Sequence, residues 1–254
     1  MTHTAIVTGA GSGIGRAIAE RFAGEGMAVV CADLNASAGT AVAADLTAAG
    51  HRALAVHTDI TDEASVADMV RCALDWQGRI DICIANAGAM IEGDILSLSL
   101  DDWNRAMRIN ATGAFLTARA VMPSLLVQGG TLVFTASTVG LAGMKGVAAY
   151  SAAKGAVVAL TRQLAADYAA RGVRVNAVAP GAVRTPLSES QFRARAADEV
   201  EFQTLLDQVI GRYPLSRWGT PAEIADVVLF LATSRSSWMT GQIIPVDGGL
   251  LELR

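Results

Sequence analysis

The 254-residue sequence predicts one α/β domain, a doubly wound parallel sheet of seven strands with helices on both faces. Two observations support this prediction. Short apolar segments alternate strictly with longer helical segments, as in right-handed βαβ units that build a parallel sheet. The strand-like segments are apolar at nearly every position, as strands buried on both faces should be. No linker, repeat or low-complexity run divides the chain, so we expect residues 1–254 to form a single domain.

In chain order, the strands are the short apolar runs and the helices are the longer segments between them. The expected strands are residues 4–8, 27–32, 53–56, 80–85, 131–135, 173–179 and 243–246. The expected helices are residues 16–23, 36–49, 62–76, 100–122, 150–168, 200–210 and 221–232. Thr61-Asp62 caps the third helix, with Asp62 and Glu63 favourable in its first turn. Asp101 and Asp102 mark the start of the fourth, and Pro221 occupies the first turn of the last.

Residues 186–215 break this alternation with a longer, more polar and more charged stretch. A long excursion at this point could cover the ligand-binding edge of the sheet, and we interpret it as a substrate lid. A solvated pair of surface helices is the alternative interpretation, and the sequence favours neither.

Composition excludes several classes of protein. Hydrophobic residues make up 52% of the chain and charged residues 17%, which favours a large buried core over disorder. The net charge of −4 and the lack of any Lys/Arg run argue against a nucleic-acid partner. No apolar run reaches the roughly 18–20 residues of a membrane span, and no signal peptide precedes the first strand. We therefore expect a cytoplasmic protein without a membrane partner.

Three cysteines and three histidines have no spacing typical of metal ligands, so no metal site is expected. Cys31 and Cys83 lie in strand-like runs, which is typical of reduced thiols in a protein core.

A glycine-rich turn, residues 9–15, connects the first strand to the first helix. Its glycines let backbone N–H groups and the helix N-terminus approach a pyrophosphate. Asp33 ends the second strand, where a carboxylate would meet the ribose of an adenosine. The carboxylate of Asp33 would repel a 2′-phosphate, and no basic residue lies between Gly9 and Gly15. The sequence therefore predicts NAD as the cofactor.

Tyr150 and Lys154 stand four positions apart in the expected helix 150–168, so their side chains share one helix face. An ammonium beside a phenol favours the phenolate and brings its pKa closer to neutrality, as a general acid or base requires. A half-buried tyrosine with a lysine extended beside it is the alternative interpretation of the spacing alone. The dinucleotide site upstream and the hydroxyl of Ser137 favour the catalytic interpretation.

Ligands of parallel sheets bind beyond the carboxyl ends of the strands. Six features of the sequence fall at these ends: residues 9–15, Asp33, Asp59, Asn86, Ser137 and the pair Pro180-Gly181. Their coincidence at one edge predicts the position of a single ligand site.

Together, these motifs resemble the short-chain dehydrogenase/reductase family in its single-domain, NAD-dependent, Rossmann-like form, over essentially the whole chain. The matching pieces are the Thr8-Gly9-x-x-x-Gly13-x-Gly15 turn, Asp59-Ile60, Asn86-Ala87-Gly88, Asn110, Ser137, Tyr150-x-x-x-Lys154, Pro180-Gly181 with Thr185, and Val246-Asp247-Gly248-Gly249. One departure is Ala85, where the family often has a first Asn before the turn.

The resemblance implies a role for each catalytic residue. Tyr150 would be the acid/base, and Ser137 would hold the substrate oxygen. Lys154 would bind the nicotinamide ribose and lower the pKa of Tyr150. Asn110 would shape its helix locally and position a water in a proton relay.

The resemblance also implies two binding sites. The cofactor-binding residues would be Gly9, Ser12, Gly13, Ile14, Gly15, Asp33, Leu34, Asp59, Ile60, Asn86, Ala87, Gly88, Tyr150, Lys154, Pro180, Gly181, Val183 and Thr185. The substrate-binding residues would be Ser137, Val139, Met144, Val147, Tyr150 and Leu187.

The expected activity is NAD-dependent hydride transfer between a secondary alcohol and a ketone, on a small, mainly apolar and neutral substrate. An anionic substrate carrying a carboxylate, a sulfonate or an acyl carrier is the alternative, with Lys145 or Arg184 as its binding residue. A dinucleotide-binding regulator without catalysis is a further alternative, although such proteins usually lack the Tyr or the Ser. The enoyl-reductase branch is disfavoured because it spaces Tyr and Lys more widely.

The helix that begins near Tyr150 is apolar nearly all round, and helix 100–122 is apolar on more than one side. A helix that packs one face on a sheet needs only one apolar stripe, so the second face favours a partner subunit. The family resemblance points to a homotetramer, with residues 246–254 at a second interface.

Overall fold

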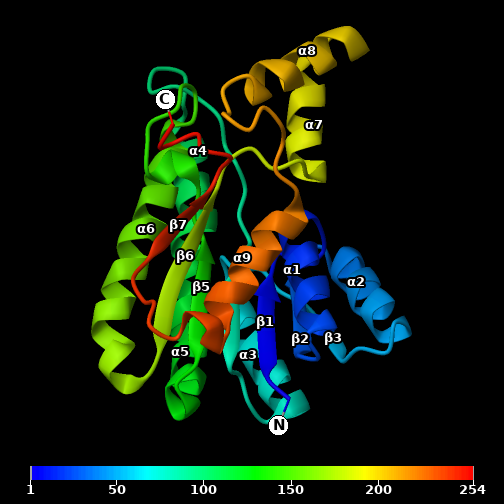
Figure 1. The fold of residues 1–254 in the computed structure, drawn as a ribbon, viewed down its shortest axis with the longest axis vertical. Helices are drawn as coiled ribbons and strands as arrows, with labels where there is room; N and C mark the ends of the chain where they lie inside the picture. Colours follow the sequence, from blue (N-terminus) through cyan, green and yellow to red (C-terminus); the bar gives the residue numbers. More distant parts are fainter. Residues whose placement is uncertain (1, 254) are drawn as a thin grey trace.

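The computed structural model describes residues 2–253, apart from the side chains of Leu187 and Ala194. Within these residues, seven strands form one sheet in the order β3-β2-β1-β4-β5-β6-β7, and every neighbouring pair is parallel (Figure 1). The strands are β1 (Thr4–Thr8), β2 (Ala28–Asp33), β3 (Ala53–His57), β4 (Ile82–Ala85), β5 (Thr131–Thr135), β6 (Arg174–Pro180) and β7 (Ile243–Val246). The predicted doubly wound parallel sheet is confirmed.

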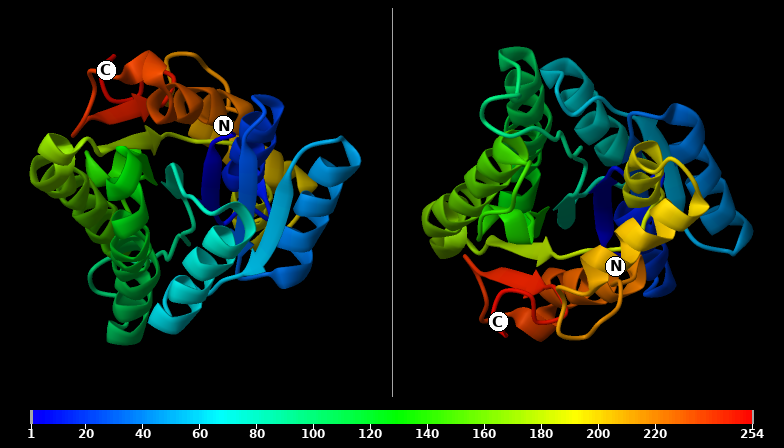
Figure 2. Two further views of the ribbon diagram at one scale, coloured as in Figure 1. Left: turned by 90° about the horizontal axis from the view of Figure 1, so that it is seen from below. Right: turned by 90° about the horizontal axis from the view of Figure 1, so that it is seen from above.

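Helices cover both faces of the sheet, as the end-on views of Figure 2 show. One face carries α1 (Gly13–Gly24), α2 (Ala36–Ala48) and α9 (Pro221–Ala232). The other face carries α3 (Glu63–Gln77), α5 (Gly113–Gln128) and α6 (Ala148–Tyr168). The strand order reverses between β1 and β4, and this switch point leaves a crevice at the carboxyl edge of the sheet.

The expected helix 100–122 is present and continues to Gln128, but it is not a regular α-helix throughout. The chain forms α4 (Leu100–Met107), then a π-helical turn (Arg108–Thr112), then α5. The buried Asn110 explains the interruption: its amide nitrogen donates to Ala106 O (3.1 Å) and to Ala89 O (2.8 Å), and its Oδ1 accepts from Ala89 N (3.2 Å). Where the Asn110 side chain bonds the loop at Ala89, the helix takes up one extra residue in a turn, as in a π-bulge.

Residues 186–210 form two helices, α7 (Pro186–Arg195) and α8 (Glu199–Ile210), that project beyond the carboxyl edge of the sheet (Figures 1 and 2). A capping box fixes the start of α7, because Thr185 Oγ1 accepts from Ser188 N (3.1 Å) and Ser188 Oγ accepts from Thr185 N (2.9 Å). The ring of Phe192 packs edge-on against that of Trp218, with the centroids 5.7 Å apart. The pair of helices therefore stands over the crevice.

Three short helical turns complete the description: Thr138–Gly140, Ala169–Arg171 and Ser234–Ser236. Among residues 2–253, no helix is both long enough and apolar enough to cross a membrane.

Candidate active site

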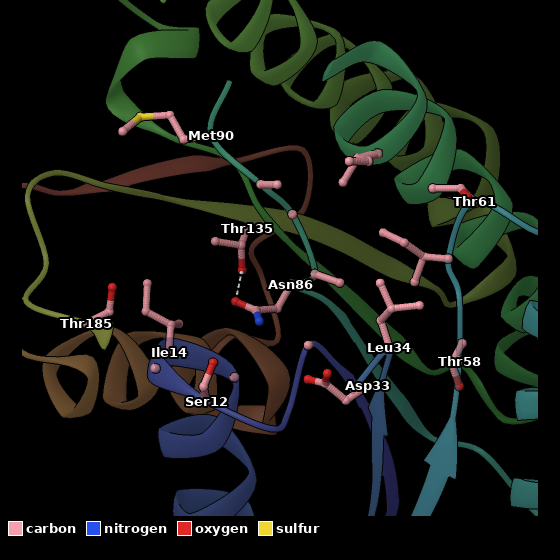
Figure 3. A pocket seen from close by; sticks show the side chains of 18 of the residues that line it. Ser12, Ile14, Asp33, Leu34, Thr58, Thr61, Asn86, Met90, Thr135 and Thr185 are labelled. Atoms are coloured by element: carbon pink, nitrogen blue, oxygen red, sulfur yellow. Dashed lines mark hydrogen bonds between the residues drawn. The ribbon is translucent and has the colours of Figure 1, made fainter. Parts of the chain in front are cut away.

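A cavity of ≈ 430 Å³ lies at the carboxyl ends of β1, β2 and β4 (Figure 3). Fifteen of the eighteen residues expected to bind the cofactor line it, and the exceptions are Pro180, Gly181 and Val183, which line the neighbouring cavity instead. The fifteen are Gly9, Ser12, Gly13, Ile14, Gly15, Asp33, Leu34, Asp59, Ile60, Asn86, Ala87, Gly88, Tyr150, Lys154 and Thr185.

The glycine-rich turn is folded so tightly that side chains are excluded from it. A Cβ on Gly15 would lie 1.9 Å from Gly9 O, and Gly9 and Gly13 have φ values of +67° and +53°, which favour glycine. The turn therefore presents bare backbone and the N-terminus of α1 to the cavity, an arrangement that fits a pyrophosphate.

Asp33 is held at the cavity wall by two backbone groups. Its Oδ2 accepts from Gly11 N (2.7 Å) and its Oδ1 from Asn35 N (2.8 Å). These bonds orient the carboxylate beside the glycine turn, and Figure 3 shows Asp33 and Leu34 together at the end of β2. A carboxylate in this position fits the ribose hydroxyls of a dinucleotide.

Asp59 and Asn86 are fixed by neighbours at the same edge. Hydrogen bonds from the backbone and hydroxyl of Thr61 to Asp59 (both 2.8 Å) hold the pKa of its carboxyl below the usual value. Asn86 Nδ2 donates to Thr8 O (3.0 Å), while its Oδ1 accepts from Thr135 Oγ1 (3.1 Å, the dashed line in Figure 3). Asn86 thereby ties the ends of β1, β4 and β5 together.

Ser137, Tyr150 and Lys154 meet beside this cavity. The side chains of Ser137 and Tyr150 are hydrogen-bonded to each other. Lys154 is 4% exposed, and its Nζ donates to Thr135 O (2.7 Å) and lies 5.7 Å from the centre of the Tyr150 ring. The structure thus brings the three predicted catalytic side chains together.

The pKa values of this group depart from the sequence expectation. Burial raises the pKa of Tyr150 to about 12, and the Ser137 hydrogen bond, which acts in the opposite direction, does not offset it. Burial also lowers the pKa of Lys154 to about 8. The expected lowering of the Tyr150 pKa by Lys154 is not seen: the ammonium, which lies over the phenol ring, is not among the groups that shift this pKa.

Asn110 lies behind this group. A Cβ on Gly88 would come 2.7 Å from Asn110 Oδ1 and 3.4 Å from Lys154 Nζ, so the loop after β4 passes between the two side chains. The absence of a side chain at Gly88 permits this close approach.

A second cavity, of ≈ 380 Å³, adjoins the first. Four of the six expected substrate residues line it: Ser137, Val139, Met144 and Tyr150. Val147 does not line this cavity; it is buried just before α6, and its backbone pairs with that of Gly93. The side chain of Leu187 lies outside the described part of the structure.

The two cations considered for an anionic substrate do not line the second cavity. Arg184 is exposed and forms an ion pair with Glu189 (2.6 Å), and Lys145 is exposed. Sequence reasoning missed the polar residues that do line it: Ser188, Gln191, Arg212 and Tyr213. They belong to the 186–215 segment, and no sequence signal showed which of its side chains face the cavity.

Sequence reasoning also missed Thr8 and Thr135 at the strand ends. The Thr8 hydroxyl accepts from Asn86 N (3.0 Å) and Ala87 N (3.1 Å), and Thr135 contacts both Asn86 and Lys154. A threonine that ends a buried strand just before a ligand-binding turn is the signal that could have indicated them.

Ile14, Met90, Thr135, Tyr150 and Thr185 line both cavities, so the phenol of Tyr150 stands where the two meet. The arrangement can place a proton donor between a dinucleotide and a mainly apolar substrate. Among the described residues, no cluster of three or more His, Cys, Asp or Glu side chains could hold a metal ion.

Comparisons with known proteins agree with this geometry. A family model described as enoyl-(acyl carrier protein) reductase matches residues 9–251. Meso-2,3-butanediol dehydrogenase of Serratia marcescens is 41% identical over 96% of this chain and 92% of its own length. 2-(S)-Hydroxypropyl-CoM dehydrogenase 3 of Xanthobacter autotrophicus is 38% identical over 96% of this chain and 94% of its own.

Solved structures give the same result. A variant of actinorhodin polyketide ketoreductase, solved with NADPH, superposes with a TM-score of 0.94 at 32% identity, covering 99% of this chain and 98% of its own. A short-chain dehydrogenase/reductase from Burkholderia xenovorans gives 0.92 at 36% identity, covering 98% and 96%. Together with the fold and the arrangement of Ser137, Tyr150 and Lys154, these matches show that the chain belongs to the short-chain dehydrogenase/reductase family.

Proposed function

We propose that the protein is an NAD-dependent oxidoreductase that interconverts a secondary alcohol and a ketone, with Tyr150 as the acid/base. The observation that supports this most directly is the position of Tyr150 at the junction of the two cavities, hydrogen-bonded to Ser137. Two of its relatives are a meso-2,3-butanediol dehydrogenase and a 2-(S)-hydroxypropyl-CoM dehydrogenase, and both names denote secondary alcohols.

The chain's own residues supply the acid/base part of the reaction. A bound nicotinamide supplies the hydride acceptor or donor. In reduction, the Tyr150 phenol, protonated at neutral pH because its pKa is about 12, donates its proton to the ketone oxygen. Ser137 donates a hydrogen bond to the same oxygen as negative charge develops there. In oxidation, the phenolate form of Tyr150 accepts the proton of the alcohol hydroxyl.

Lys154 and Asn110 act from behind the phenol in this proposal. The ammonium of Lys154 would bind the ribose next to the nicotinamide and favour the phenolate through its charge. Asn110, which holds the loop at Ala89, would position a water near Lys154 that carries protons to solvent.

Asp33 supports NAD over NADP, because its backbone-anchored carboxylate would repel a 2′-phosphate. The ketoreductase structure with NADPH belongs to another chain at 32% identity, so it does not decide the preference here. We expect the double variant Asp33→Ser/Leu34→Arg to shift the ratio of kcat/KM for NADPH over NADH upward by about 100-fold or more. Equal use of the two cofactors by the wild-type protein would contradict the proposal.

A panel of secondary alcohols and ketones, followed through the absorbance of reduced nicotinamide, tests the activity itself. An enoyl thioester in the same panel tests the reaction named by the family model. Turnover of ketones with NADH, without reduction of the enoyl thioester, is expected. Reduction of the C=C bond alone would contradict the proposal.

We also propose that the protein works in the cytoplasm as a homotetramer. The free, buried Cys31 and Cys83 support a reducing compartment. Exposed apolar side chains such as Phe115 and Trp238 support contacts between subunits, which would cover them. Cell fractionation tests the location, and light scattering tests the assembly.

A further inference from the structure

One residue with a positively charged side chain, the exposed Arg212, lines the second cavity. Among the described residues that line the ≈ 380 Å³ cavity with Ser137 and Tyr150, Arg212 is the only one with a charged side chain. Arg212 lies two residues past the end of α8, and its backbone N–H donates to Val209 O (3.1 Å). The walls around it are mainly apolar and include Met144, Trp218 and Leu251.

Arg212 forms no ion pair with any carboxylate among the described residues. Its neighbouring arginines in the 184–217 segment are all paired: Arg184 with Glu189, Arg193 with Glu199, Arg195 with Glu92, and Arg217 with Glu223. The guanidinium of Arg212, in contrast, makes no ion pair or hydrogen bond with any residue that the structure describes.

Nearby carboxylates are engaged elsewhere. Asp247, which lies close enough to act on the same tyrosine as Arg212, accepts from Gly249 N and Leu251 N (both 3.0 Å). Asp207, one turn earlier on α8, accepts from Gln203 Nε2 (2.9 Å). Among the described residues, neither carboxylate forms an ion pair with Arg212, so the donors of its guanidinium remain available to a ligand.

We propose that Arg212 binds a carboxylate or sulfonate at the end of the substrate remote from the reacting carbon. A guanidinium presents a planar fork of donors that matches such anions, and these charge-assisted bonds are among the stronger ones in proteins. The amide of Gln191, which lines the same cavity, is a second donor available to the anion. The substrate is then a hydroxy or keto anion with an apolar middle section, an inference that rests on the proposed function. This anionic substrate replaces the neutral substrate expected from the sequence.

The test uses methyl ketones of increasing length that end in a carboxylate: 4-oxopentanoate, 5-oxohexanoate and 6-oxoheptanoate, each paired with its methyl ester. Arg212→Gln should lower kcat/KM for the best carboxylate by about tenfold or more, mainly through a higher KM, because the contact is remote from the reacting carbon. The matched ester should change by less than about twofold. Arg212→Lys should keep part of the preference, since it keeps the charge but loses the fork.

Arg184→Gln is the matched control, because Arg184 is an exposed arginine of the same segment that does not line the cavity. It should leave the ratio of carboxylate to ester unchanged. Equal losses for carboxylate and ester in Arg212→Gln, or no loss for either, would overturn the proposal. So would a wild-type preference for the esters.

A binding experiment separates this proposal from the activity. Calorimetry with pentanoate and pentanamide should show that the wild-type protein binds the anion more tightly and that Arg212→Gln removes the difference. If no ketone is reduced, the proposed function fails, and this titration still decides the role of Arg212. If ketones are reduced but both ligands bind alike to both proteins, only the role of Arg212 is refuted.

Discussion

Burial shapes the chemistry of the site most strongly at Lys154. The ammonium is nearly inaccessible to water and has one protein oxygen, Thr135 O, within hydrogen-bond distance. Desolvation disfavours its charged form and lowers its pKa to about 8. The residue therefore stands close to its titration point in the working range of most enzymes.

This shift predicts a pH dependence of stability. Between about pH 8 and the ordinary value of 10.5, unfolded Lys154 keeps a proton that folded Lys154 has lost. The free energy of unfolding of the wild-type protein should therefore rise with pH across this window relative to Lys154→Met, by up to about 1.4 kcal/mol per pH unit. Urea denaturation of both proteins from below to above this window measures the difference. Parallel curves would show that the pKa of Lys154 is not lowered by folding.

That Ser137, Tyr150 and Lys154 come together could be predicted from the sequence, but their electrostatics could not. Tyr150 and Lys154 were indicated by spacing and Ser137 by the strand that precedes it, because these are local features. The pKa of Tyr150 and the choice between Arg184 and Arg212 depend on which side chains the folded chain buries or pairs. Contacts of this kind join residues far apart in sequence, and no local pattern encodes them.

Among the elements, the β1–α1 turn is the most tightly constrained. Gly15→Ala would place a Cβ 1.9 Å from Gly9 O, so the turn must open. We expect a loss of about 1–3 kcal/mol in the free energy of unfolding. NADH binding should weaken by about tenfold or more, since the phosphates would meet a displaced backbone.

Gly24 provides the matched control for this prediction. It ends the same helix, and a Cβ there would meet nothing within 4 Å. Gly24→Ala should leave NADH binding unchanged and stabilise the protein by about 0.4–1 kcal/mol. Similar effects of the two substitutions, measured by urea denaturation and NADH fluorescence, would refute the role given to the turn.

The helices α7 and α8 are the elements proposed to act as a lid. Among the described side chains of residues 186–210, only Phe202 and Leu206 are buried, so these helices are weakly anchored. Their amide hydrogens should exchange about tenfold faster or more than those of α6 in the free protein, and should be protected when NADH and a ketone bind. Exchange as slow as that of α6, with no change on binding, would favour the alternative of a fixed surface pair.

The helix formed by α4, the π-helical turn and α5 shows what a sequence pattern does not reveal about an element. The family resemblance implied that Asn110 shapes its helix locally, but the π-helical form of Arg108–Thr112 was not predicted, because such a turn alters the apolar periodicity over only five residues. Its cause is the bond between Asn110 and the Ala89 backbone, 21 positions away. The existence and type of the neighbouring elements were predictable, since each has a long apolar face.

At the scale of the whole molecule, the alternation of strands and helices was enough to predict a doubly wound parallel sheet. The order β3-β2-β1-β4-β5-β6-β7 and the crevice at its switch point follow from long-range pairing, which the sequence does not show directly. The edge at which both cavities lie was nevertheless predictable, because the carboxyl ends of parallel strands always lie together.

Assembly should depend on the outer face of α5. Phe115 is 44% exposed there, with Arg119 5.1 Å from its ring centre. Because Phe115 is exposed in a single subunit, Phe115→Glu should change the free energy of unfolding of that subunit little. In a tetramer, the same substitution would introduce a charge into an apolar contact between subunits. Light scattering should show a tetramer for the wild type and smaller species for Phe115→Glu. Val200→Glu, at a 76% exposed apolar position on α8, is the control and should remain tetrameric. A wild-type monomer at micromolar concentration would contradict the proposal.

The most direct test of the proposed function is the turnover number of Tyr150→Phe, measured with NADH and a ketone reduced by the wild-type protein. This substitution removes only the hydroxyl that stands between the two cavities and bonds Ser137. We predict that kcat falls about 100-fold or more, while the Kd for NADH changes by less than about twofold. Tyr168→Phe, at the far end of α6, controls for the loss of a tyrosine hydroxyl and should keep full activity. If Tyr150→Phe kept more than a few per cent of wild-type kcat, Tyr150 would not be the acid/base.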